Sequence, residues 1–345
     1  MNPRVLSSLL LAASSASLFS QAPPPPPSFE LAHYSIHRSS DTDAISSGDF
    51  NNDGKLDLVV QGGLGPVGAP GANEYGITVL LGNGDGTFQP PVVIGSTATL
   101  TSSIAVADFD HDGKLDIAAF TNRGFDLFYG NGNGSFQAPI HTATVTTAIY
   151  GAAGNIFSDG FTDIALADGD GNVEIFKNEG GKTFALINTI TGLAPTFGIV
   201  QLQTGDLNGN GVSDIAVITT TAAYVLWNTG QGNFTKALLS AYPDAVAVNL
   251  NDLNQDGRSD ILISYSCSNS NPQAGHVNPS TCAAIDVYYG QGGNKTSFRH
   301  LVTDSGPSAP RNIFAADVNG DGIADLVASS SDTSGSSTST SSSDL

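Results

Sequence analysis

A nine-residue pattern recurs along this chain and constrains its fold more than any other feature. Five intact copies begin at residues 49, 108, 206, 252 and 317, with an oxygen-bearing side chain at positions 1, 3, 5 and 9 and glycine at position 6. A degenerate sixth copy begins at Asn155 and carries Phe157 at position 3. The spacing of the copies defines a repeat of about fifty residues, which is the length of one supersecondary unit. The sequence therefore predicts one repeated architecture.

A second landmark keeps a fixed distance from the first. Each unit has a Gly/Asn-rich turn that ends at a phenylalanine, and the next nine-residue copy begins 18 to 22 residues later; these residues are Phe88, Phe136, Phe184, Phe234 and Phe298. Apolar runs at 103–107, 117–120 and 126–129, and a further run after the phenylalanine, predict four short strands per unit. The two longer units carry insertions at 62–75 and 267–282, between the second and third strands.

Four strands per unit favour a β-propeller over a stacked solenoid, because the chain contains a split unit. Phe29 stands 20 residues before Asp49, so residues 29–37 are predicted to form the last strand of a unit that the C-terminal copy begins. We therefore expect an all-β fold, a propeller of four-stranded blades closed by this N-terminal strand. Six units are visible, and we expect six or seven blades.

Composition excludes several classes of function. The chain has 12 Lys and Arg against 32 Asp and Glu, a net charge of −20, so nucleic acid is not expected as a partner. With 40 glycines and few glutamates, a helical bundle is disfavoured. Scattered histidines and the absence of nucleophile or zinc motifs argue against an enzyme. Asp168 and Asp170 are the one candidate pair of catalytic carboxylates, although neighbouring acids in a Gly-rich turn are more often solvated.

The two ends of the chain indicate where the protein acts. Residues 1–22 resemble a cleaved export signal that ends in Ser-Gln-Ala, with cleavage after Ala22; the alternative of a membrane anchor needs a longer apolar run. Residues 23–27 form a proline linker, 28–328 the propeller, and 329–345 a Ser/Thr-rich tail. We expect a secreted, periplasmic or cell-surface protein without a membrane span. Cys267 and Cys282 are then expected to form a local disulfide, with two free thiols as the alternative.

The side chains of the nine-residue pattern match the chemistry of a calcium site. Oxygen ligands from positions 1, 3, 5 and 9, with the backbone carbonyl of position 7, suit Ca²⁺, which takes hard oxygen donors in flexible number. Metal-free Asx turns are the alternative. About five Ca²⁺ sites are predicted, and the degenerate copy is expected to lose its ion. The candidate ligands are Asp49, Asn51, Asp53, Lys55, Asp57, Asp108, Asp110, Asp112, Lys114, Asp116, Asp206, Asn208, Asn210, Val212, Asp214, Asp252, Asn254, Asp256, Arg258, Asp260, Asp317, Asn319, Asp321, Ile323 and Asp325.

The pattern also resembles a known family. The loop followed by an apolar run, as in Asp57-Leu-Val-Val and Asp116-Ile-Ala-Ala, together with the Gly-Asn-Gly-x-Gly-x-Phe turn, is similar to the FG-GAP/VCBS repeats of exported bacterial proteins and of the integrin α-subunit propeller. The resemblance covers residues 28–328. It implies a propeller, usually of seven blades, whose loops bind Ca²⁺ at one end.

We expect the chain to be a non-catalytic binding or adhesion module, a monomer that binds a glycan or an extracellular protein. The alternatives are a polysaccharide-degrading lyase or glycosidase on the same scaffold and a purely structural surface protein. Aromatic side chains are candidates for ligand contact, with packing in the core as their alternative use; they are Tyr75, Tyr150, Trp227, Tyr288 and Tyr289.

Overall fold

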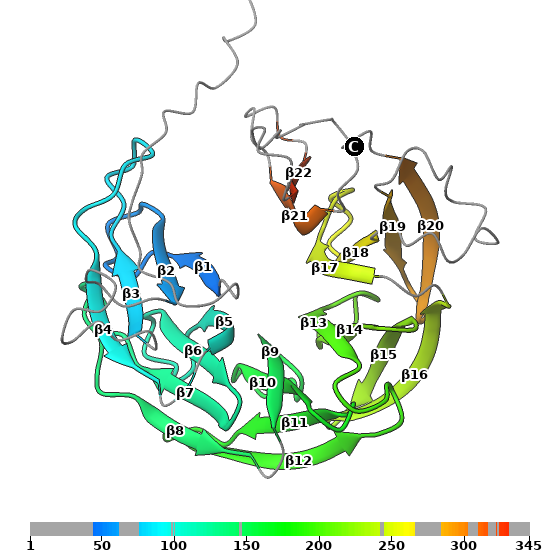
Figure 1. Ribbon diagram of the computed structural model, residues 1–345, viewed down its shortest axis with the longest axis horizontal. Coiled ribbons are helices and arrows are strands. Elements are labelled where there is room, and N and C mark those ends of the chain that lie inside the picture. Colours follow the sequence, from blue (N-terminus) through cyan, green and yellow to red (C-terminus); the bar gives the residue numbers. More distant parts are fainter. Residues whose placement is uncertain are drawn as a thin grey trace, which may run out of the picture. The chain divides into compact units, whose positions relative to one another are not determined.

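The computed structural model describes residues 44–61, 76–97, 99, 101–144, 147–241, 245–265, 284–302, 310–316, 322 and 324–330. None of these residues lies in a helix, so this part of the chain also offers no helix that could cross a bilayer. They form antiparallel sheets that follow one another along the chain (Figure 1). The predicted all-β fold is confirmed.

Five sheets have four strands each, paired in chain order. The first contains β1 (Ile45–Gly48), β2 (Asp57–Gln61), β3 (Gly76–Leu80) and β4 (Val92–Ser96). The second contains β5 (Thr101–Ala107), β6 (Asp116–Thr121), β7 (Gly124–Phe128) and β8 (Ile140–Ala143). The third contains β9 (Ala148–Gly154), β10 (Asp163–Asp168), β11 (Val173–Asn178) and β12 (Phe184–Ile190).

The fourth sheet contains β13 (Ile199–Gly205), β14 (Asp214–Thr219), β15 (Ala223–Gly230) and β16 (Asn233–Ser240). The fifth contains β17 (Ala245–Asn251), β18 (Asp260–Tyr265), β19 (Ala284–Gln291) and β20 (Lys295–Val302). The sixth is described as one pair, β21 (Pro310–Ala316) and β22 (Asp325–Ser330). Four strands per unit, with the insertions between the second and third strands, are thus as the sequence predicts.

Successive sheets stack face to face. The first strands of neighbouring sheets contact one another, β1 with β5, β5 with β9, β9 with β13, β13 with β17 and β17 with β21. One apolar cluster fills each space between consecutive sheets; the cluster between the second and third, for example, joins Phe125 and Leu127 to Ile164 and Phe176. Because the second strands are covered on both faces, β6, β10, β14 and β18 are buried at every position. Their continuous apolar runs follow from this double burial.

The landmark phenylalanines pack against the preceding sheet. Phe136 of the second sheet meets Phe50 of the first in an edge-to-face contact at 5.6 Å, and Phe184 of the third meets Phe109 of the second at 6.2 Å. Phe50 and Phe109 each occupy position 2 of a nine-residue loop. Each of these landmark phenylalanines thus packs on the loop of the preceding unit, in an aromatic contact between neighbouring sheets.

Several predictions concern residues outside the described part of the chain. These are the export signal, the proline linker, the closing strand at 29–37, the disulfide between Cys267 and Cys282, and the C-terminal tail from residue 331 on; residues 329 and 330, predicted to belong to the tail, lie in β22. Closure of the propeller and the number of blades stay predictions.

Candidate metal centre

Each nine-residue loop joins the first strand of a sheet to the second, so the loops lie at the same end of their sheets. Position 6 is a glycine with positive φ in each, for example +80° at Gly54 and +81° at Gly113. Position 4 also has a positive φ in the five described loops, and only one of its residues is glycine. The five residues at this position are Asn52, His111, Ser158, Gly209 and Gln255. Sequence reasoning found the turn at position 6 and missed the one at position 4.

The first aspartate organises the loop from within. The Asp49 carboxylate accepts the N–H of Asp53 at 3.1 Å and the N–H of Gly54 at 2.8 Å. Asp108, Asp206 and Asp252 accept the corresponding two N–H groups in their own loops. The negative charge is thereby held at the centre of the turn, where converging donors keep it in place.

The ninth aspartate is buried and ties two chain segments together. One oxygen of Asp57 accepts the N–H of Phe50 at 2.8 Å, and the other accepts the N–H of Gly82, just after β3, at 2.7 Å. Asp116, Asp214 and Asp260 repeat this arrangement. Asp163 repeats it in the degenerate loop. Position 9 therefore has a structural role that does not depend on an ion, and sequence reasoning missed it.

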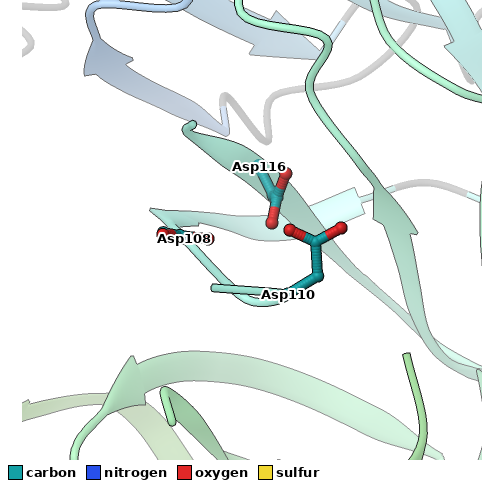
Figure 2. A group of neighbouring side chains, drawn as sticks. All are labelled: Asp108, Asp110 and Asp116. Carbon is teal, nitrogen blue, oxygen red and sulfur yellow. The ribbon is translucent and has the colours of Figure 1, made fainter. Parts of the chain in front are cut away.

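The loop 108–116 gathers three carboxylates. One oxygen from each of Asp108, Asp110 and Asp116 lies within 4.8 Å of the other two, and Figure 2 shows the carboxyl groups of Asp110 and Asp116 facing each other. The Oδ1 atom of Asp110 is buried and has no hydrogen-bond partner. Burial of the Asp116 carboxyl, with the charge of Asp110 nearby, raises its pKa to about 6. A divalent cation among these oxygens would satisfy Asp110 and offset the repulsion, so the donor set fits the predicted Ca²⁺.

Position 5 of the loops is engaged by basic side chains. In the loop 108–116, Asp112 is not one of the three grouped carboxylates, and its Oδ2 lies 2.6 Å from the Nζ of Lys114. The hydrogen bond from Lys114 holds the pKa of the Asp112 carboxyl below its ordinary value. Lys55 and Arg258 pair in the same way with Asp53 and Asp256, at 3.4 and 3.0 Å. In all three loops, residue 7 thus partly neutralises residue 5.

The remaining loops offer fewer charges. At position 3, the Oδ1 atoms of Asn51, Asn208 and Asn254 each accept the N–H of position 5 at 3.0 Å. Burial, with the charge of Asp206 nearby, raises the pKa of Asp214 to about 6. In the last loop Asp317, Asn319, Asp321 and Ile323 lie outside the described residues, and Asp325 is buried.

In the degenerate loop a lysine lies near position 3, which has lost its side-chain oxygen. Asp159, at position 5, pairs with the Nζ of Lys177 at 3.0 Å, and this ammonium lies 5.4 Å from the ring centroid of Phe157, at position 3. The loss of the ion from this copy stays a prediction.

Three of the candidate residues for ligand contact or catalysis have structural roles. Trp227 and Tyr288 are buried in the cluster between the fourth and fifth sheets, so they are core residues. Asp168 is buried and accepts the N–H groups of Asp170 and Asn172 within the turn from β10 to β11. The structure therefore assigns Asp168 a role in the turn. Tyr75 lies outside the described residues.

Stacked antiparallel sheets with four strands each and one loop repeated at their common end define a β-propeller architecture. A family model described as "FG-GAP-like repeat" matches residues 67–119, 155–217 and 206–263. The chain therefore contains FG-GAP-like repeats over these residues. No curated protein matches it.

Solved structures share the fold at low sequence identity. The BP39L lectin from Burkholderia pseudomallei is 15% identical with a TM-score of 0.60, covering 87% of this chain and 84% of the lectin. A lectin of Agrocybe aegerita, described as recognising non-reducing terminal N-acetylglucosamine, is 20% identical with a TM-score of 0.56, covering 87% and 80%. BBS1N, solved in complex with ARL6DN, is 12% identical with a TM-score of 0.52, covering 86% and 77%. Two of these three are lectins, and all three share the propeller fold with this chain.

Proposed function

We propose that this chain is an exported, calcium-binding propeller module that binds glycans without catalysis. The observation that carries the calcium assignment is the buried, unpartnered Oδ1 of Asp110, which lies among the oxygens of Asp108 and Asp116. A buried carboxylate oxygen without a donor is costly, and a cation removes that cost. Glycan binding is supported by the two lectins with the same fold.

In this proposal, backbone N–H groups of the chain orient the ligand carboxylates before an ion binds. The first aspartate is oriented by the N–H groups of positions 5 and 6, and the ninth by the N–H groups of position 2 and of the end of the third strand. Bound Ca²⁺ would supply the positive charge that these carboxylates lack. Filling five sites would change the charge of the chain without its signal, Lys and Arg 11 against Asp and Glu 32, from −21 to about −11.

The test uses purified protein without the signal. Calorimetric titration with Ca²⁺ should show saturable binding, and Asp108→Asn should remove one site while the others persist. A glycan array read in Ca²⁺ and in chelator tests the ligand class. A reducing-sugar assay on the bound polysaccharide separates a lectin from an enzyme, since product release would overturn the non-catalytic assignment. Absence of bound ion at millimolar Ca²⁺ would overturn the metal assignment.

A further inference from the structure

The turn between the third and fourth strands of a sheet contacts the loop of the preceding sheet. The N–H of Gly134 donates to the carbonyl of Phe50 at 2.9 Å, and Asn208 donates to Asn294 at 2.7 Å. A side chain on Gly232 would collide with the ring of Phe157. Phe157 and Asn208 both stand at position 3, so in these loops the residue at position 3 faces the next sheet.

In the loop 108–116 this contact brings in a charge. The Nζ of Lys182, in the turn from β11 to β12, lies 3.2 Å from Oδ2 of Asp110, the residue at position 3. The same ammonium donates to Oε1 of Gln137 at 3.0 Å and lies 4.0 Å from the ring centroid of Tyr129. Lys182 also adopts a φ of +68°, a region that non-glycine residues seldom occupy. Three partners and a fixed backbone hold the ammonium against the acidic group.

Asp110 therefore has two prospective cation partners on its two oxygens. Oδ2 binds Lys182, while Oδ1 is buried without a partner in the group formed with Asp108 and Asp116. Oδ1 of Asp110 would hold a divalent ion while Oδ2 of the same carboxylate holds the ammonium. Two cations that share one carboxylate repel each other where screening by water is incomplete. A single partly exposed ion pair fixes the orientation of Asp110 only weakly, so we expect the repulsion between the two cations to be the larger effect.

In the degenerate loop, too, a lysine ammonium lies at a loop carboxylate. There Lys177 takes the carboxylate of position 5 directly, and its ammonium lies over the ring that replaces the position-3 oxygen. In this chain, lysine side chains are thus found at loop carboxylates that an ion could otherwise use.

We propose that Lys182 is a tethered cation that competes with the divalent ion for Asp110, so that ion binding by the loop 108–116 and the Lys182 contact between the second and third sheets oppose each other. The inference rests on the proposed calcium binding. It makes the loop with most carboxylates a weak site, and it makes the seam between these two sheets sensitive to the ion.

The test is Lys182→Met, which removes the charge and keeps an unbranched side chain only one atom shorter. Calorimetric titration should show that one site binds Ca²⁺ at least about tenfold more tightly than it does in the unchanged protein. The gain should vanish when Asp108→Asn is added, which assigns it to this loop. Lys182→Arg, which retains the charge, should bind Ca²⁺ as weakly as the unchanged protein.

Thermal unfolding gives a second reading. Lys182→Met should melt at a lower temperature than the unchanged protein in chelator, because the Asp110 carboxylate loses its ion pair with Lys182, and the deficit should shrink or reverse in Ca²⁺. Lys236→Met is the matched control, since Lys236 lies 5.4 Å from the ring of Tyr224 and donates to the carbonyl of Gly192. Its melting temperature should respond to Ca²⁺ as that of the unchanged protein does.

The outcomes separate the two proposals. Unchanged or weaker Ca²⁺ binding by Lys182→Met, with normal binding by the unchanged protein, overturns the competition and leaves calcium binding in place. Failure of the unchanged protein to bind Ca²⁺ at any site overturns the proposed function itself.

Discussion

In the five loops that the structure describes, the ninth aspartate has a structural role beside the proposed binding of an ion. Its carboxylate accepts two or more backbone N–H groups in the interior, and a buried N–H without an acceptor is costly. Asp163 isolates this role, because its loop has lost the side-chain oxygen at position 3, yet its carboxylate still accepts the N–H groups of Ile156, Phe157 and Asn178. Retention of this aspartate in the degenerate copy thus has a structural reason.

Asp163→Ala should lower the free energy of unfolding by about 3 kcal/mol or more, since three buried donors lose their acceptor. Asp159→Ala, in the same loop, removes an exposed ion pair with Lys177 and should cost about 1 kcal/mol or less. Urea unfolding in chelator measures both. Equal effects would mean that the hydrogen bonds of Asp163 contribute nothing beyond a surface charge.

At the scale of the element, the loop and the turn of the next sheet form one unit of contact. The sequence predicted strands, turn and loop because each has a local signal: glycine for positive φ, alternating or continuous apolar residues for strands. It did not predict that the landmark Phe136 packs on Phe50, nor that Lys182 reaches Asp110, because these partners belong to different repeats. The spacing of the landmarks is visible in the sequence, but only the stacked sheets show which neighbouring unit each phenylalanine contacts.

The seam between the third and fourth sheets can be tested at Gly232. Its φ is +70°, and a Cβ there would lie 2.5 Å from the ring of Phe157. At Gly181, which has a φ of +59°, an added Cβ would have no atom within 4 Å. Gly181→Ala should cost about 1 kcal/mol for the left-handed backbone alone, and Gly232→Ala should cost about 1–3 kcal/mol more. A double-mutant cycle with Phe157→Ala should recover the excess; purely additive effects would contradict the contact.

For the whole molecule, the buried loop carboxylates link stability to pH. The pKa values of Asp116 and Asp214 are about 6, above the ordinary 3.8, chiefly because of burial. Between these values the folded state binds more protons than the unfolded state. The free energy of unfolding of the ion-free protein should therefore fall as pH rises from about 4 to 6, by on the order of 2 kcal/mol for each group.

In Ca²⁺, the free energy of unfolding should instead rise with pH. The ion binds the ionised carboxylates, and its binding weakens as they become protonated below about pH 6. Urea unfolding at pH 4.5 and 7 in metal-free buffer and in Ca²⁺ measures both dependences. The difference made by Ca²⁺ should be larger at pH 7, and Asp116→Asn should remove its own part of the pH dependence. An ion-free protein that is more stable at pH 7 than at pH 4.5 would show that the burial of these carboxyls does not govern its stability.

In the four intact loops that the structure describes, the double anchoring by the first and ninth aspartates has a kinetic consequence. Backbone N–H groups already hold these carboxylates in place through bonds within the chain, so little conformational entropy remains to be lost when a ligand arrives. Such a preorganised cradle should capture an ion at a rate set by diffusion and electrostatic attraction, and it should release the ion without unravelling its sheet.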